Sequence, residues 1–259
     1  LTDTQAGYIT AAQAAALTSK QIAVLSSTTD NNSGAGGYTN THIDGLTSDA
    51  VAALTPAQFA ALTSTGGQLA NFGADQAVAI TSAQIKGLDQ TDVDALTSEA
   101  VLALKPATLS AITTAAIDGL DVNALAAFSP VQMAALSPAQ FKNLSNAQLG
   151  ALTSDQTAFL SSAQIKTLTD SDIDALTSDA VLALTPATIK AILPTSIAAT
   201  TNGTPALDSL AFASLSLEQM AAFTPAQMAA LTTGQISKIG SDQAPALTSA
   251  QLSKLTAGQ

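Results

Sequence analysis

A large apolar residue recurs at every eighth position of this chain, and this repeat limits what the chain can fold into. We call this residue the head of an octad and number the following positions from +1 to +7. Position +1 is mostly Thr, Ser or Asp, +4 is often Gln, and +5 is usually a second apolar residue. The octad therefore reads Leu-Thr-x-x-Gln-Ile-x-Ala, and about thirty-two octads fill the chain. The longest unbroken run of heads is Phe72, Ile80, Leu88, Leu96, Leu104, Ile112, Leu120, Phe128, Leu136, Leu144, Leu152, Leu160, Leu168, Leu176, Leu184 and Ile192.

Breaks in the octad phase divide the chain into segments. Two extra residues stand near Gly66 and Gly67 without ending the array. The longest break is a polar insertion, SSTTDNNSGAGG, which has no apolar register and many turn-forming residues, so it predicts a loop or hinge. The segments are N-terminal octads (1–25), the polar insertion (26–37), the main octad solenoid (38–199), a second phase break (200–206) and C-terminal octads (207–259).

The octad encodes the start of a short helix rather than a strand, because apolar spacings of five and three do not alternate with a period of two. In one octad Ser137 is the expected N-cap and Gln140 its capping-box partner, while Pro138 falls at N1, where its missing N–H costs nothing. Leu136 and Phe141 are spaced for a hydrophobic staple. The sequence thus predicts an all-α solenoid of very short capped helices, one per eight-residue repeat.

Two internal similarities bear on the number of octads in each coil of this solenoid. Residues 81–112 resemble residues 161–192 at an offset of ten octads. Residues 42–51 resemble residues 172–181 at an offset of about sixteen octads. Because both offsets are even, we expect two octads per coil rather than three.

Composition excludes several classes of protein. The chain is 47% hydrophobic and 10% charged, with a net charge of −11, and its 8 basic residues are all Lys. Without Arg and with an acidic balance, the chain is not expected to bind nucleic acid or an anionic membrane surface. The absence of Cys excludes disulfides and thiolate metal sites. No apolar stretch reaches the roughly 18 residues that a membrane span needs.

The sequence offers few candidates for a chemical site, and we expect neither an enzyme nor a cofactor. His42 has no second His and no Cys beside which to bind metal or act as a base, so it is expected to face solvent. Calcium is the one ion that the acidic candidates would suit. Asp30 and Asn32 precede a Gly but lack the other ligands of a calcium loop. The weak candidates for calcium are Asp30, Asn32, Asp92, Asp94, Asp172 and Asp174.

The two aspartate pairs, Asp92 with Asp94 and Asp172 with Asp174, have a structural explanation that we prefer. Asp92 and Asp172 stand at +4 in place of Gln. A carboxylate in the first turn of a helix is stabilised by the helix dipole. The pairs therefore favour helix starts over a shared cation.

Four octads carry a resemblance to a known kind of repeat: Leu54-Thr55-Pro56-Ala57-Gln58, Ile80-Thr81-Ser82-Ala83-Gln84-Ile85, Phe223-Thr224-Pro225-Ala226-Gln227-Met228 and Leu247-Thr248-Ser249-Ala250-Gln251-Leu252. They resemble the Leu-Thr-x-x-Gln octapeptide arrays of very large secreted or surface proteins of bacteria, which are often adhesin-like. The resemblance implies export and a surface role, and it supplies no functional residues.

Two functions remain open from the sequence. The first is an extracellular or cell-surface structural or adhesive repeat protein, such as a stalk, filament, sheath or adhesin spacer. The alternative is a solenoid binding module for a peptide, glycan or partner protein, for which a row of exposed aromatic residues is expected. Because the chain begins within an octad at Leu1-Thr2 and stops within one at Gln259, we also expect either head-to-tail self-association into a filament or a longer parent chain.

Overall fold

The computed structural model describes residues 6, 8–25, 45–63, 68–197, 207 and 209–259. All regular structure in these residues is helical, with no strand, and the α-helices are four to eight residues long. The all-α solenoid of short helices is therefore confirmed. The chain divides into two compact units, unit 1 (Leu1–Ala127) and unit 2 (Phe128–Gln259), each of which is described by itself.

The helices of unit 1 are α2 (Ala11–Ala16), α3 (Ser19–Leu25), α4 (Ser48–Ala53), α5 (Pro56–Thr63), η1 (Gln68–Asn71), α6 (Ala74–Ala77), α7 (Ser82–Ile85), α8 (Gln90–Asp94), α9 (Ser98–Ala103), α10 (Pro106–Leu109), η2 (Ile117–Gly119) and α11 (Val122–Ala126). Those of unit 2 are α12 (Pro130–Ala135), α13 (Pro138–Lys142), α14 (Asn146–Gly150), α15 (Ser154–Thr157), α16 (Ser162–Ile165), α17 (Asp170–Ala175), α18 (Ser178–Leu182), α19 (Pro186–Ala191), α20 (Pro194–Ile197), α21 (Ser209–Ala213), α22 (Leu217–Ala222), α23 (Pro225–Ala230), α24 (Thr233–Ile236), η3 (Ala244–Ala246) and α25 (Ser249–Leu252).

The predicted capping box is present where the sequence placed it. The Ser137 hydroxyl accepts the Gln140 backbone N–H at 3.3 Å, and the Gln140 Oε1 accepts the Ser137 backbone N–H at 2.8 Å. Pro138 is the first residue of α13. The preceding head, Leu136, is the extended C-cap of α12, so this head ends one helix and leads into the next. One octad thus makes one helix and one corner.

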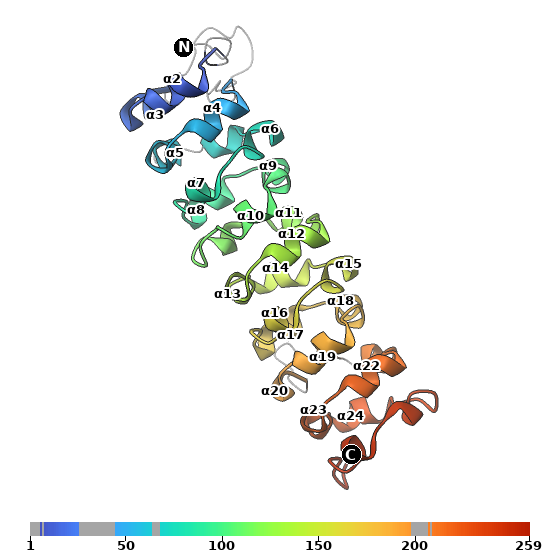
Figure 1. The fold of residues 1–259 in the computed structure, drawn as a ribbon. Coiled ribbons are helices and arrows are strands. Elements are labelled where there is room, and N and C mark those ends of the chain that lie inside the picture. Colours follow the sequence, from blue (N-terminus) through green and yellow to red (C-terminus); the bar gives the residue numbers. More distant parts are fainter. Residues whose placement is uncertain (1–5, 7, 26–44, 64–67, 198–206, 208) are drawn as a thin grey trace, which may run out of the picture. The chain divides into compact units, whose positions relative to one another are not determined.

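Three octads make one coil, so the expectation of two is wrong. Each helix packs on the third element after it, as α13 does on α16 and α16 on α19. Figure 1 shows this stacking within each unit. The step of three holds from α4 to η2 and throughout unit 2. The offsets between duplicated segments do not give the number of octads per coil, because an array can duplicate by any whole number of octads.

The core of each unit is built from the head and the +5 residue of each octad. Leu136 is 2% exposed and Phe141 is fully buried. Thr157 is the one +5 residue of the long run that is not apolar, and it is nevertheless fully buried. Its hydroxyl donates to the Ala180 carbonyl at 2.8 Å, so the polar group is satisfied by the neighbouring coil.

Coils approach most closely at Gly119. A methyl group at this position would lie 2.2 Å from the Gln90 carbonyl oxygen. We expect Gly119→Ala to destabilise unit 1 by about 1–3 kcal/mol, because backbone must move to admit the methyl group. Gly87→Ala is the matched control, since its methyl would lie 3.5 Å from the nearest atom. Urea unfolding of both variants tests this, and equal losses would contradict close coil packing as the cause.

Candidate functional site

A buried glutamine at +4 joins many of the coils to the one before. The Gln227 side chain is fully buried, and its Oε1 accepts the Thr224 backbone N–H at 2.7 Å. Its Nε2 donates to the carbonyls of Ile189 and Ile192, each at 2.8 Å. Those two carbonyls lie in the last turn and at the C-cap of α19, and the Ile189 carbonyl also accepts the Ile192 backbone N–H at 3.1 Å. One amide therefore caps the start of its own helix and the end of another.

The same glutamine bridge, defined as an Nε2 donating to backbone carbonyls of the preceding coil, recurs in both units. The bridge is made by Gln58, Gln76, Gln84, Gln156, Gln164, Gln219, Gln227, Gln235, Gln243, Gln251 and Gln259. Smaller side chains can take the place of Gln. The Thr108 hydroxyl donates to the Ile80 carbonyl at 3.1 Å, for example.

The separation in sequence between bridged residues gives the number of residues in one coil. It is 28 residues for Gln164 and Leu136, which corresponds to three octads and the four positions from head to Gln. It rises to 30 residues for Gln84 and Leu54, on either side of the two extra residues near Gly66. It is 35 residues for Gln227 and Ile192. The same pairing of Gln with a head is therefore kept when residues are added between the bridged positions.

Sequence reasoning found the capping role of this glutamine and missed the bridge. A capping box accepts Glu as readily as Gln, because it uses only the side-chain oxygen. The bridge requires a donor, which a carboxylate lacks. Both glutamates of the chain, Glu99 and Glu218, stand at +3, and none stands at +4. The occurrence of Gln rather than Glu at +4 was the sequence feature that could have indicated the bridge.

The structure places the calcium candidates in separate environments. The Asp92 carboxylate accepts the Asp89 backbone N–H at 3.0 Å, and that of Asp172 accepts the Thr169 N–H at 2.7 Å, so both act in capping boxes. Asp94 and Asp174 stand two residues further along their helices. Within the described part of the chain, no three His, Cys, Asp or Glu side chains are grouped to hold a metal. Asp30, Asn32, His42 and the segments 26–37 and 200–206 lie outside the described residues.

Asp121 is the N-cap of α11, and its hydrogen bonds lower its pKa. Its carboxylate accepts the Ala124 backbone N–H at 2.9 Å and the Ser98 hydroxyl at 2.9 Å. The Ala124 bond first, and then the Ser98 bond, lower the pKa of Asp121 below its ordinary value of 3.8. Since α9 carries Ser98 and packs on α11, the charged form of Asp121 helps to join two coils.

A depressed pKa in the folded state means that Asp121 stabilises unit 1 above its unfolded value of 3.8. This contribution is lost as the pH falls through the lower pKa of the folded state. We expect Asp121→Asn to flatten the acid limb of stability against pH, and Ser98→Ala to flatten it partly. Thermal unfolding followed by circular dichroism between about pH 2 and pH 6 measures both effects. An acid limb unchanged in Asp121→Asn would exclude this carboxylate as its source.

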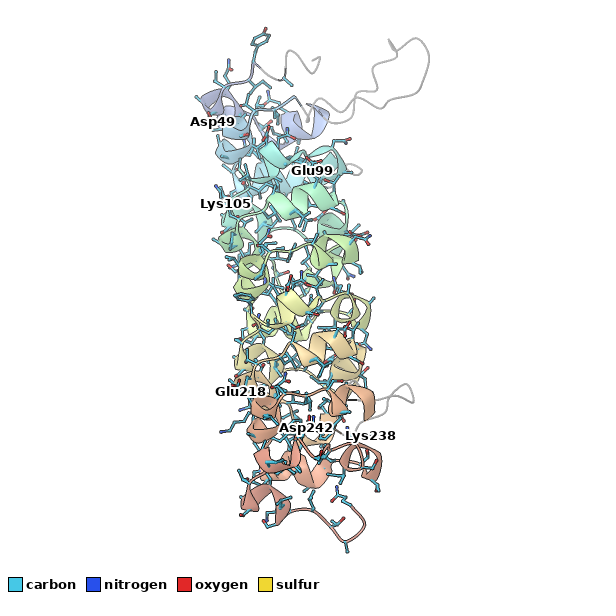
Figure 2. All side chains as sticks on the ribbon, turned by 90° about the vertical axis from the view of Figure 1, so that its right-hand side faces the viewer. Asp49, Glu99, Lys105, Glu218, Lys238 and Asp242 are labelled. Carbon is cyan, nitrogen blue, oxygen red and sulfur yellow. The ribbon has the colours of Figure 1, made fainter. Side chains whose placement is uncertain are left out.

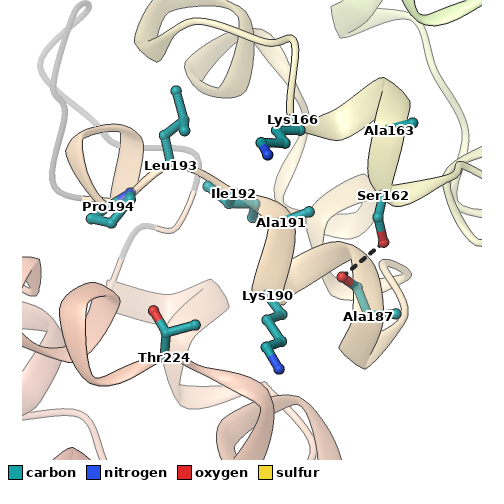
Figure 3. Close-up of a pocket in the computed structure, with 10 residues that line it drawn as sticks. All are labelled: Ser162, Ala163, Lys166, Ala187, Lys190, Ala191, Ile192, Leu193, Pro194 and Thr224. Carbon is teal, nitrogen blue, oxygen red and sulfur yellow. Dashed lines mark hydrogen bonds between the residues drawn. The ribbon is translucent and has the colours of Figure 1, made fainter.

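Two open pockets lie between coils. The larger, of about 670 Å³, is in unit 2, and its titratable groups are Lys166 and Lys190 (Figure 3). The second, of about 580 Å³, is in unit 1 and is bordered by Asp75 and Glu99. None of the helices in the described ranges is long and apolar enough to cross a membrane.

These features define a helical repeat protein built as a solenoid. Two stretches, residues 125–162 and 225–257, match the ALTTAQ repeat family, and the chain is similar to that family over them. Residues 230–235 read Ala-Leu-Thr-Thr-Gly-Gln, which differs from the name of the repeat at one position. No curated protein matches the chain.

Proposed function

We propose that this chain is an extracellular structural or adhesive repeat protein that serves as a stalk, filament, sheath or adhesin spacer at the cell surface. The glutamine bridge carries the proposal. The polar side chains that recur in the octads are used to cap helices and to join coils, as Gln227 does for α19 and α23. A solenoid whose repeated residues serve only its own extension is suited to spanning distance.

The surface of the chain supports this role. Only 10% of its residues are charged, and it contains no Cys whose oxidation state would depend on the compartment. The resemblance to octapeptide arrays of large secreted bacterial proteins agrees with export. The proposal needs neither a catalytic residue nor a cofactor.

End-to-end extension belongs to the same proposal. Successive coils pair corner carbonyls with bridging side chains and stack their apolar heads, so one array can continue into another, either in a longer chain or between copies. An end-to-end contact of this kind is heterologous and need not close, so it would give a filament.

The alternative, a binding module for a peptide, glycan or protein, is less well supported. Among the described aromatic residues, only Tyr8 and Phe159 are exposed, and they belong to different units. The buried ones are Phe59, Phe72, Phe128, Phe141, Phe212 and Phe223. No aromatic row of the kind that binding faces use is formed by the described residues.

Labelling of intact cells that make the protein tests the proposal. An antibody against unit 2 should label them without permeabilisation, and electron microscopy of the purified chain should show particles that lengthen when the coil 136–159 is duplicated. Labelling that appears only after permeabilisation would overturn the extracellular role. Particles that do not lengthen would overturn the spacer role.

A further inference from the structure

Three lysines form a column on one side of unit 2. Lys142, Lys166 and Lys190 all stand at +6 of their octads and are spaced by one three-octad coil. The helices of these octads, α13, α16 and α19, pack on one another in that order. All three side chains are exposed. Figure 3 shows Lys166 and Lys190 on neighbouring coils at the edge of the larger pocket. We call these residues the lysine column.

Three acidic residues form a corresponding column on unit 1. Asp49, Asp75 and Glu99 stand at +3, in the first turns of α4, α6 and α9, which also pack in that order. All three are exposed, and Figure 2 labels Asp49 and Glu99. Among the described residues, none forms an ion pair with these three or with the lysine column. We call Asp49, Asp75 and Glu99 the acidic column.

Within its three octads each column keeps a single sign of charge, although the stack that carries the lysine column continues to α22 and η3, whose octads place Glu218 and Asp242 at +3. The octads 136–143, 160–167 and 184–191 contain no acidic residue, and the octads 46–53, 72–79 and 96–103 contain no Lys. The helix dipole favours an acid near the start and a lysine near the end of any one helix. It explains the position within the octad, but it does not explain why each sign occupies successive coils of one side.

We propose that the lysine column of one copy binds the acidic column of a second copy, with the two solenoids side by side and their axes parallel. Solenoids of the same hand that run parallel present antiparallel helices to each other where they face. Position +3 of one copy then lies opposite +6 of the other. The acids at +3 therefore meet the lysines at +6, one charge pair for each coil.

The remaining residues of the two faces fit the same arrangement. The +3 residues of the lysine side, which lie opposite the +6 residues of the acidic side, are all Ala, and those +6 residues are small or apolar. Val78 and Leu102 are 39% and 36% exposed, although the heads and +5 residues of their octads are buried. The facing sets are Ala139, Ala163 and Ala187 against Ala52, Val78 and Leu102.

The contact is independent of end-to-end extension and differs from it physically. Each copy offers both columns, so the contact is heterologous and can recruit further copies. Its attraction is between exposed charges, which salt screens strongly. An end-to-end contact between apolar coil faces would persist in high salt.

Sedimentation of the full chain tests the proposal through a charge swap. At low ionic strength the weight-average mass of the wild type should rise with concentration, and it should return to the monomer mass in about 0.5 M salt. The variant K142E/K166E/K190E and the variant D49K/D75K/E99K should each stay monomeric alone. An equal mixture of the two should regain association, because one supplies acidic columns and the other basic ones.

K86E/K105E/K254E is the matched control, since it changes the net charge equally but leaves the lysine column intact, and it should associate as the wild type does. Circular dichroism should show all variants folded; the neutral variant K142Q/K166Q/K190Q replaces any that is not, and it should also lose association. A monomeric wild type at low ionic strength, association unaffected by K142E/K166E/K190E, or a mixture that stays monomeric would each overturn the proposal. So would a monomeric wild type that instead adsorbs to anionic vesicles through these lysines.

Discussion

Gln227→Glu is expected to destabilise unit 2 by about 3–5 kcal/mol. The substitution keeps the shape of the side chain and the oxygen that caps α23, but it removes the donor that reaches two carbonyls at 2.8 Å. Because the site is fully buried, the new carboxylate would face those carbonyls without a compensating charge. Urea unfolding monitored by circular dichroism measures the loss.

Gln13→Glu provides the matched control for this experiment. Gln13 is exposed, and its Oε1 accepts the Thr10 backbone N–H at 2.9 Å in an ordinary capping box. Glutamate can make the same bond, so the expected change is within about 0.5 kcal/mol. If both substitutions cost the same, the buried glutamine would contribute through capping alone, and the bridge would carry no stability of its own.

The features that sequence reasoning recovered are those encoded within one octad. The capping box of Ser137 and Gln140, the Pro138 at N1 and the burial of Leu136 with Phe141 all depend on residues fewer than six positions apart. Local hydrogen-bonding chemistry and hydrophobic spacing are sufficient to place them. The helical class of the fold followed from these alone.

The number of octads in a coil is not encoded in the same local way. Ten octads separate residues 81–112 from residues 161–192, and ten is not a multiple of three. The duplicated sequence is therefore not tied to one place in the coil. Any octad with an apolar head, a cap and an apolar +5 residue can fill any of the three sides, so similarity between octads carries no information about coil length.

The glutamine bridge could not be predicted from neighbouring residues, because its partners are distant in sequence. The carbonyls that Gln164 reaches belong to Met133 and Leu136, 31 and 28 residues away, and a partner is defined only once three octads close the coil. The prevalence of Gln at +4 is compatible with a donor there, but it could not indicate the acceptor. Likewise, the columns of charge become visible only when octads are read in steps of three.

Phe141→Ala is expected to cost about 3–5 kcal/mol of the stability of unit 2. Phe141 stands at +5 of its octad and is fully buried between α13 and the coils that pack on it. Its loss removes apolar contact and leaves a cavity that short helices, fixed at both ends by caps and bridges, are poorly able to close. Chemical denaturation of the purified variant measures the change.

Phe159→Ala in the same unit separates the effect of position from that of residue type. Phe159 stands at +7 and is 62% exposed, so its removal should change stability by no more than about 0.5 kcal/mol. The contrast follows from burial, because Phe141 lies in the core whereas Phe159 lies at the surface. A large loss in Phe159→Ala would show that +7 also makes stabilising contacts, whereas a small loss in Phe141→Ala would mean that capping and bridging, rather than the apolar core, hold the coils together.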